Sequence, residues 1–145
     1  MNPADLNTVE GVYPLRPRLE HGPVVGGSEG VGRVAEVGPD VHGLCVGDLV
    51  VPVRPNLGTW GQELVALENE VHKVREGPLE GLALTSVCMA TAFRLLEDFV
   101  ELCPGDVVIQ NAATSAVGQV SGARARAYPQ LFHREMQRSD SANRL

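Results

Sequence analysis

Short stretches of alternating apolar and polar positions, separated by glycines and prolines, fill the first half of the chain. Residues 30–38, 47–53, 63–67 and 71–74 carry this alternation, which predicts β-strands. Strands this short, with turn residues about every 8 to 12 positions, predict a small barrel or sandwich.

The period of the pattern changes at residue 78. From there to about residue 100, apolar side chains recur every three or four positions, which predicts a helix that Pro78 would begin. Residues 107–109 are consecutively apolar, as expected of a strand that is buried on both faces. The small residues at 111–118 then form a turn able to open a second helix.

The apolar stripe of that second helix is lost near residue 120. Ser121, Gly122 and Pro129 are poor helix residues, so we expect no crossover helix beyond this point. Residues 120–145 contain five arginines against Glu135 and Asp140, a local charge of +3 in a chain whose net charge is −6. With no lysine and no recognisable binding motif, this tail is expected to be solvated or poorly ordered, and we expect no nucleic-acid partner.

The composition excludes several other classes of protein. With 145 residues, 43% hydrophobic and 21% charged, the chain resembles a globular domain with a real core. No apolar run approaches the roughly 18 to 20 residues that span a bilayer, which predicts no membrane insertion. The first ten residues lack the features of a secretory signal or a mitochondrial transit peptide. Three scattered cysteines favour neither a disulfide framework nor a four-cysteine zinc site.

A glycine-rich segment carries a family resemblance. Residues 26–38 read Gly-Gly-Ser-Glu-Gly-Val-Gly-Arg-Val-Ala-Glu-Val-Gly, and Gly-Asp follows at 47–48. Together with Asn-Pro-Ala-Asp at 2–5 and Pro-Gly-Asp at 104–106, this order resembles the medium-chain dehydrogenase/reductase superfamily over roughly residues 2–119.

The resemblance implies a mixed α/β fold in three parts. Residues 1–77 would form a GroES-like β-barrel catalytic domain that is incomplete at its N-terminus. Residues 78–119 would form a connecting helix and the start of a Rossmann-type cofactor-binding domain, and residues 120–145 a divergent basic tail. Since a complete dinucleotide domain has about six parallel strands, the resemblance also implies that this chain is truncated.

The same resemblance argues against a metal. Zinc-dependent members place cysteine where Asn2 stands, histidine where Ser28 stands and a further cysteine near Val87. A catalytic zinc needs three ligands of the histidine, cysteine or carboxylate type, and these residues are poor substitutes. We therefore expect no metal site.

Within the superfamily, the chain most resembles the mitochondrial trans-2-enoyl-CoA reductases, through residues 2–7, 11–13, 57–60, 91–94 and 108–112. Those homodimeric enzymes use NADPH to reduce a C=C bond conjugated to a thioester of CoA or acyl carrier protein. The resemblance places the family's tyrosine proton donor on Tyr13. A phenol can remain protonated at neutral pH, as this role requires. Without the resemblance, Tyr13 would read as an aromatic covering the end of a barrel strand.

The resemblance also places the cofactor contacts. Thr114, Ser115, Ala116 and Val117 would meet the phosphates, because small residues let the backbone approach and a helix N-terminus follows. The family's nicotinamide-contacting asparagine falls on Cys88, whose thiol cannot make the same amide hydrogen bonds.

Three functional interpretations stay open. The first is an NADPH-dependent 2-enoyl thioester reductase of mitochondrial fatty acid synthesis, with this chain nearly inactive alone. The second is a quinone oxidoreductase of the same superfamily. The third is a non-catalytic product of alternative splicing or incomplete gene modelling, which the abrupt change of composition after Gln119 favours.

Overall fold

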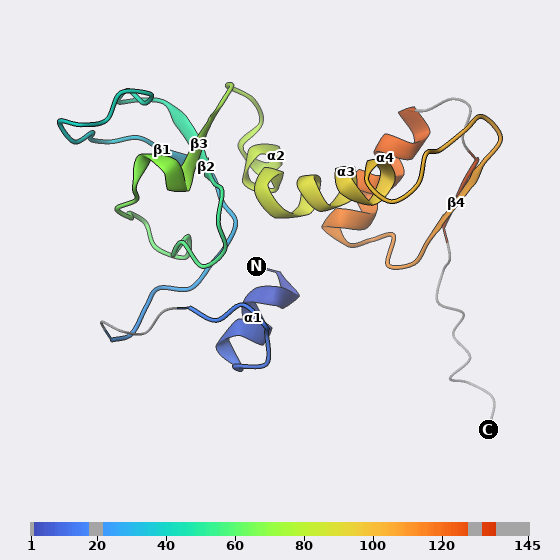
Figure 1. Cartoon of the computed structure of the whole chain (residues 1–145), viewed down its shortest axis with the longest axis horizontal. Coiled ribbons are helices and arrows are strands. Elements are labelled where there is room, and N and C mark those ends of the chain that lie inside the picture. The colour runs from blue at the N-terminus through green and yellow to red at the C-terminus, as the bar shows by residue number, and fades with distance from the viewer. Residues whose placement is uncertain (1, 18–21, 128–131, 136–145) are drawn as a thin grey trace. The chain divides into compact units, whose positions relative to one another are not determined.

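A computed structural model describes residues 2–17, 22–127 and 132–135 (Figure 1). Contacts divide the chain into two compact units, Met1–Val87 and Cys88–Leu145, and each is described by itself. Helices and strands occur in both units, which confirms the mixed α/β class. The described part contains no helix long and apolar enough to cross a membrane.

Unit 1 is built on a short antiparallel sheet. Its strands are β1 (Gly32–Arg33), β2 (Leu49–Pro52) and β3 (Val71–Val74), in the order β1-β2-β3, so β2 is central. Leu49 lies opposite Val74 in the register of β2 and β3. The other elements are α1 (Pro3–Val9), the 3-10 helix η1 (Glu68–Glu70) and α2 (Leu79–Ala83).

The predicted strands at 47–53 and 71–74 are confirmed, whereas the other two are corrected. The strand expected over 30–38 is reduced to β1, and residues 63–67 form no strand. The side chain of Val65 is fully exposed. An alternating sequence becomes a strand only where a neighbouring strand supplies hydrogen bonds and its apolar positions are covered, and this segment has an uncovered valine.

The core of unit 1 lies beneath β2, where the side chains of Leu49 and Val51 are each 4% exposed. At the entrance to β2, the chain turns through Gly47 with φ of +96°, a conformation that favours glycine. Asp48 fixes this turn, because its Oδ2 accepts a hydrogen bond from the Cys45 amide at 2.9 Å and lies 2.7 Å from the Lys73 ammonium on β3.

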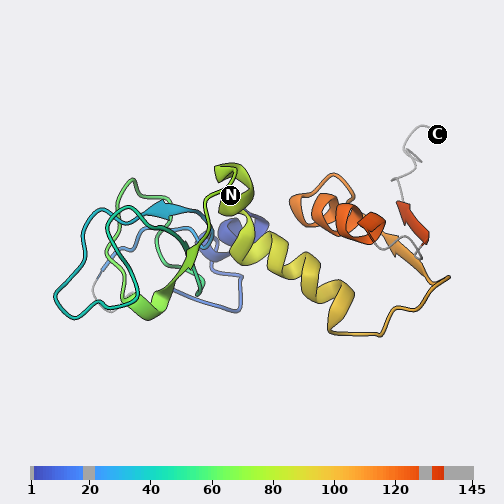
Figure 2. The ribbon, with the colours of Figure 1, turned by 90° about the horizontal axis from the view of Figure 1, so that it is seen from above.

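Unit 2 contains a βαβ segment. Strand β4 (Val107–Gln110) leads through α4 (Ala116–Ala127) to β5 (Phe132–Glu135), and the two strands pair in parallel with Val107 opposite Phe132 (Figure 2). Before it, the π-helical turn η2 (Thr85–Met89) continues from unit 1 into α3 (Ala90–Glu97). Helices α3 and α4 pack against each other.

Helix α4 corrects the expectation that helical structure ends near residue 120. Its buried residues Gly118, Ser121, Gly122 and Ala125 recur at helical spacing and form one face. The face consists of small side chains, so a search for large apolar residues does not detect it. The remaining part of the predicted disordered tail, 128–131 and 136–145, lies outside the described residues.

The arginines of α4 are also less solvated than expected. The Arg124 guanidinium stacks over the Phe93 ring of α3, 4.4 Å from its centre, and its Nη2 lies 2.6 Å from Glu97 Oε1. Both contacts join α4 to α3, and the stacking adds a cation–π attraction. Basic character here therefore serves helix packing.

Strand β4 differs from the expectation of a strand buried on both faces. Val107 and Ile109 are 53% and 60% exposed, whereas Val108 and Gln110 are half-buried. The Gln110 side-chain amide donates to the Gly118 carbonyl at 2.9 Å, so this face of the strand meets α4. Alternation then turns Val107 and Ile109 to the opposite face, which nothing in the described residues of unit 2 covers.

Gly118→Ala is expected to destabilise unit 2. A methyl group at Gly118 would collide with the Ala112 carbonyl oxygen and lie 2.9 Å from the Ala113 Cα, both backbone atoms that cannot rotate away. Alanine usually stabilises a helix relative to glycine, so the sign tests the packing. We expect a loss of about 1 to 3 kcal/mol in the free energy of unfolding, measured by urea denaturation. Gly38→Ala, which meets no atom within 4 Å, is the control and should be neutral.

The Asp48 pair makes unit 1 sensitive to acid. Hydrogen bonds from Lys73 and from the Cys45 amide lower the pKa of the Asp48 carboxyl. A lowered pKa contributes stability that is present at neutral pH and lost as the pH falls through the pKa of the folded state. Asp48→Asn should therefore reduce the loss of stability between neutral pH and about pH 3 in denaturant titrations. Asp40→Asn, at an exposed carboxylate, is the control and should lose as much stability in acid as the wild type. An equal loss of stability in Asp48→Asn and in the wild type would contradict the prediction.

Candidate functional site

The side chain of Glu29 lies where three segments of unit 1 meet. Its Oε2 accepts a hydrogen bond from the Asn2 side-chain amide at 2.8 Å, and its Oε1 accepts one from the Val87 backbone N–H at 2.9 Å. Asn2 precedes α1, Glu29 follows the paired glycines 26–27, and Val87 lies in η2. One carboxylate therefore joins positions that are 27 and 58 residues away in sequence.

This cluster coincides with the positions compared above with zinc ligands. Asn2 and Val87 both contact Glu29, and Ser28 is its neighbour in the chain. Asn2 and Val87 direct N–H donors at the carboxylate, whereas a cation needs lone pairs. No group of three histidine, cysteine or acidic residues able to hold a metal occurs in the described ranges. The donor set therefore does not fit a zinc ion, and absence of a metal stays a prediction.

The loop that carries Glu29 is bound to a second loop, residues 56–60. The amides of Gly58 and Trp60 donate to the carbonyls of Gly27 and Gly26 at 3.1 and 3.0 Å. The Thr59 hydroxyl donates to the Glu29 carbonyl at 2.8 Å. Gly27 has φ of +104°, and a methyl group there would lie 2.6 Å from Trp60 Cδ1. The paired glycines thus allow the loops to approach closely, which fixes the backbone of Glu29.

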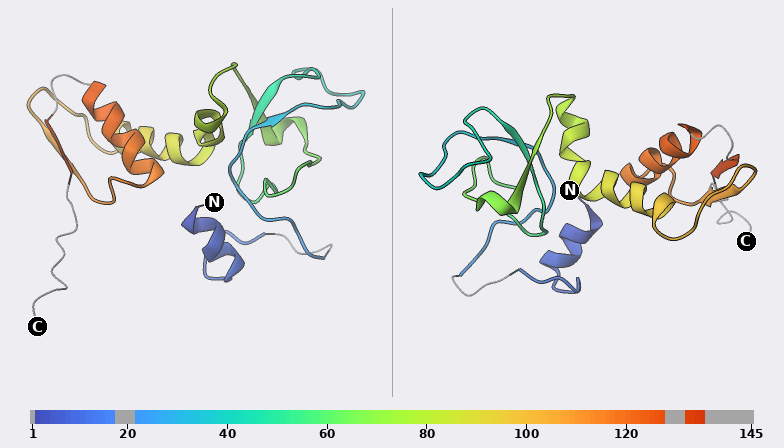
Figure 3. Two further views of the ribbon diagram at one scale, coloured as in Figure 1. Left: turned by 180° about the vertical axis from the view of Figure 1, so that it is seen from behind. Right: turned by 45° about the horizontal axis from the view of Figure 1, so that its top comes forward.

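Tyr13 follows α1 directly and is tied back to it. The N–H groups of Val12 and Tyr13 both donate to the Asn7 carbonyl, at 3.0 and 3.1 Å. The Tyr13 side chain is half-buried. Figure 3 shows α1, in blue, as a short helix at the N-terminal end of the chain. The position of Tyr13 is therefore linked to that of α1.

The segment after Tyr13 borders an open hollow of about 900 Å³ in unit 1. Its apolar wall includes Leu15, Val25 and Leu57. Two guanidinium groups, from Arg16 and Arg54, also line it. The hollow can hold an elongated ligand that has an apolar part and an anionic part.

The predicted phosphate-binding residues come together in unit 2. Thr114 and Ser115 are exposed, and Ala116 and Val117 are the first two residues of α4. Ser115 precedes the helix, and its hydroxyl oxygen accepts a hydrogen bond from the Gly118 N–H at 3.0 Å, which caps the helix. The helix N-terminus, with the exposed Thr114 before it, suits an anion such as phosphate.

Cys88 is placed differently from its predicted role. It lies in η2 and is 2% exposed, so a cofactor reaches the thiol only if neighbouring side chains move. Tyr13 belongs to unit 1, whereas Cys88 and the turn residues belong to unit 2. Of the predicted site residues, the structure brings together Thr114, Ser115, Ala116 and Val117.

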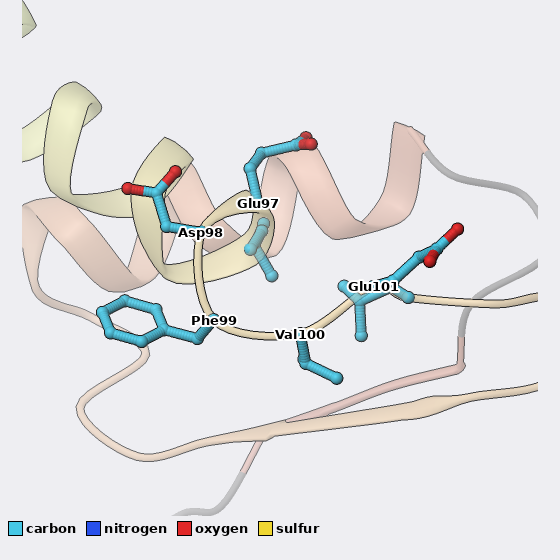
Figure 4. Close-up of a pocket in the computed structure, with 7 residues that line it drawn as sticks. Glu97, Asp98, Phe99, Val100 and Glu101 are labelled. Carbon is cyan, nitrogen blue, oxygen red and sulfur yellow. The ribbon is translucent and has the colours of Figure 1, made fainter.

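A second hollow, of about 370 Å³, lies in unit 2 beneath residues 96–102 (Figure 4). Glu97, Asp98 and Glu101 surround it together with Phe99 and Val100. Its walls come from one continuous stretch, and Phe99 is 77% exposed. It contains no nucleophile or phosphate-binding turn, so it is a poor candidate site.

Sequence reasoning missed Glu29. The sequence feature that could have indicated it is a single acidic residue within the glycine-rich residues 26–30, a stretch whose backbone is flexible unless other groups hold it. The run suggests close loop packing, but not which donors the carboxylate meets, because those lie far away in the sequence.

Comparison with known proteins decides the family. The alcohol dehydrogenase GroES-like domain matches residues 1–76, more than half of the chain. The chain belongs to this family. The match confirms the GroES-like fold predicted for the N-terminal part.

Its relatives narrow the family. Over 120 residues, or 82% of the chain, it is 51% identical to the mitochondrial enoyl-[acyl-carrier-protein] reductase of Arabidopsis thaliana and 50% identical to that of Xenopus tropicalis. It is therefore a homologue of the mitochondrial enoyl reductases, as predicted. The chain spans about a third of the length of these relatives, 31% and 33%.

Solved structures of enoyl thioester reductases also resemble the chain. The mitochondrial 2-enoyl thioester reductase heterodimer Etr1p/Etr2p of Candida tropicalis matches 97% of the chain with a TM-score of 0.82 and 29% identity. A complex of Etr1p with NADP and crotonyl-CoA matches with a TM-score of 0.83 at 29% identity. A quinone oxidoreductase of Pseudomonas syringae matches with a TM-score of 0.79 at 28% identity. The chain covers 44%, 44% and 42% of those chains.

The chain is expected not to bind zinc specifically. The N–H donors of Asn2 and Val87 point at the Glu29 carboxylate and would repel a cation there, so zinc should not stabilise the fold. Dialysis against a chelator, or addition of equimolar Zn²⁺, should leave the melting temperature unchanged within about 1 °C. A rise of several degrees with zinc that Asn2→Ala abolishes would contradict this.

Proposed function

We propose that the chain is part of an NADPH-dependent reductase of trans-2-enoyl thioesters of CoA or acyl carrier protein, acting in mitochondrial fatty acid synthesis. The observation that carries the proposal is the 51% identity to an enoyl-[acyl-carrier-protein] reductase over 120 residues. The relative solved with NADP and crotonyl-CoA, at a TM-score of 0.83, supports both the cofactor and the thioester class. The relatives' mitochondrial location supports the same location here.

In this proposal, the residues of the chain bind the reactants and supply a proton. NADPH, when bound, supplies the hydride that adds to the β carbon. The turn residues Thr114, Ser115, Ala116 and Val117 would hold its phosphates at the N-terminus of α4, where oriented N–H groups favour negative charge. Charge then develops on the thioester oxygen, and Tyr13 delivers a proton to the α carbon.

The hollow lined by the segment that follows Tyr13 suits the thioester substrate. Leu15, Val25 and Leu57 offer apolar surface to an acyl chain. Arg16 and Arg54 line the same hollow, and guanidinium groups bind phosphate well. Arg54 already pairs with Glu70 at 2.6 Å, which leaves Arg16 as the better anion partner.

The proposal extends to partners and organisation. The likeness to a dimeric reductase structure supports dimer formation by a longer form of the protein. The βαβ segment of unit 2 would be the first part of a Rossmann-type domain, since it leads from a parallel strand through a phosphate-suited turn into a helix. No nucleic-acid or membrane partner is part of the proposal.

A second candidate function is quinone reduction by the same superfamily. It is favoured by the match to the quinone oxidoreductase of Pseudomonas syringae, at a TM-score of 0.79. The identity of 28% to that enzyme is well below the identities to the enoyl reductases. Dependence on Tyr13 separates the two, because only the thioester reaction as proposed here uses the phenol as proton donor.

The chain alone is expected to reduce crotonyl-CoA with NADPH at least roughly a hundredfold more slowly than a full-length relative, because a misplaced or partial cofactor site costs this much. The assay follows NADPH absorbance. Turnover equal to that of a full-length relative would contradict the expectation that the chain alone is nearly inactive.

The chemistry is tested in a full-length relative that carries this chain's residues 2–119. Tyr13→Phe in that protein should lower kcat for crotonyl-CoA by about 10²- to 10⁴-fold. Turnover of a quinone by the same variant is the control and should change little. Quinone turnover exceeding crotonyl-CoA turnover before mutation would instead support the second candidate.

A further inference from the structure

The Glu29 carboxylate has a charge requirement that follows from its partners. Each oxygen accepts from an N–H group, Oε2 from Asn2 and Oε1 from Val87, at 2.8 and 2.9 Å. Neither contact survives if a donor replaces the oxygen concerned. A carboxylate offers an acceptor at each of its oxygens, whereas a glutamine presents one oxygen and one NH₂ group, so it can satisfy one partner but not both.

Hydrogen bonds at the two ends of α1 link Glu29 to Tyr13 through the helix. Asn2, held by Glu29, precedes α1, and its backbone N–H donates to Asp5 Oδ2 at 2.9 Å. Asp5 is 6% exposed, so this contact is shielded from water. The far end of α1 presents the Asn7 carbonyl, which accepts from the Tyr13 N–H at 3.1 Å. A seven-residue helix is short enough to move as one body.

Glu29 is itself held on its backbone side. The Thr59 hydroxyl donates to its carbonyl at 2.8 Å, and the neighbouring Ser28 hydroxyl oxygen accepts from the Asn56 N–H at 3.1 Å. The carboxylate therefore projects from a fixed loop. The Asn2–Glu29 contact connects the start of α1 to this loop at 26–30.

We propose that Glu29 is a positioning residue for Tyr13: its ionised carboxylate fixes the start of α1 to the 26–30 loop and to Val87, and α1 in turn sets the place of the phenol. The inference rests on the proposed function for its catalytic meaning, since Tyr13 is the proton donor there. Its structural content, that Tyr13 moves when Glu29 loses its two donors, is independent of any turnover.

The test uses the whole chain labelled with 3-fluorotyrosine. Its two tyrosines, Tyr13 and Tyr128, give two ¹⁹F resonances that Tyr128→Phe assigns. Glu29→Gln and Glu29→Ala should shift the Tyr13 resonance. They should also lower hydrogen-exchange protection of the Val87 and Tyr13 amides by roughly tenfold or more, the worth of a charge-assisted hydrogen bond. Glu36→Gln, an exposed glutamate of the following segment, is the matched control and should change neither.

A swap of donor and acceptor separates positioning from general damage to the fold. Combining Glu29→Gln with Asn2→Asp lets the new amide donate to the new carboxylate while its oxygen still accepts from Val87. Asp is also as good a residue as Asn before a helix. The double variant should restore the Tyr13 resonance and both protections, which a merely destabilised fold would not do.

Three outcomes overturn the proposal. They are an unmoved Tyr13 resonance in Glu29→Ala, unchanged protection of Val87, and failure of the double variant to restore what Glu29→Gln loses. None of these readouts involves crotonyl-CoA or NADPH. The two proposals can also be separated. If the Glu29 variants behave as expected but Tyr13→Phe in the full-length protein keeps its activity, the proposed function is wrong and the positioning role of Glu29 is supported.

Discussion

An ionised carboxylate held between two N–H donors is the contact on which unit 1 depends. The Glu29 carboxylate accepts hydrogen bonds from the Asn2 side-chain amide and from the Val87 backbone amide. Removing a single partner from such a group leaves the charge without compensation, which costs more than the contact itself contributes. The segments that meet here are consequently coupled, although they are far apart in sequence.

Close backbone approach plays the corresponding part in unit 2. Gly118 lies against the backbone of Ala112 and Ala113, and the small face of α4 continues this contact along the helix. The Gly118 N–H donates to the Ser115 hydroxyl oxygen, and the Gly118 carbonyl accepts from the Gln110 side-chain amide. Strand, turn and helix are thus locked at one residue without a side chain. Both units use glycine where two backbones touch, at Gly27 and at Gly118, and polar contacts secure the result.

These observations show which parts of the fold a sequence can reveal. Strands 47–53 and 71–74 were predictable because both apolar alternation and a pairing partner exist, and the turn before α4 because small residues precede a helix. Residues 63–67 have the alternation but no neighbouring strand to pair with, and a local sequence pattern cannot show whether such a strand is present. The length of α4 was missed because its buried face consists of small residues, and hydrophobic periodicity weighs side-chain size.

The candidate site divides along the same line. Thr114 to Val117 were predicted because a phosphate-suited turn is local in sequence, and they lie at the start of α4. Tyr13 was identified through family resemblance, since a single tyrosine beside a proline carries little information. Glu29 was missed because its role is defined by donors at positions 2 and 87, and only the folded chain brings those together.

The donor set around Glu29 bears on the chemistry proposed for Tyr13. In an enoyl thioester reduction, the charge that develops on the thioester oxygen needs a hydrogen-bond donor or a cation nearby. Asn2 and Val87, two of the three positions compared with zinc ligands, direct N–H groups at the Glu29 carboxylate, so they are not arranged to hold a cation. A proton donor with a fixed position then has to meet the reacting carbon within hydrogen-bonding reach. A carboxylate that holds the donor's helix in place would meet that demand through geometry.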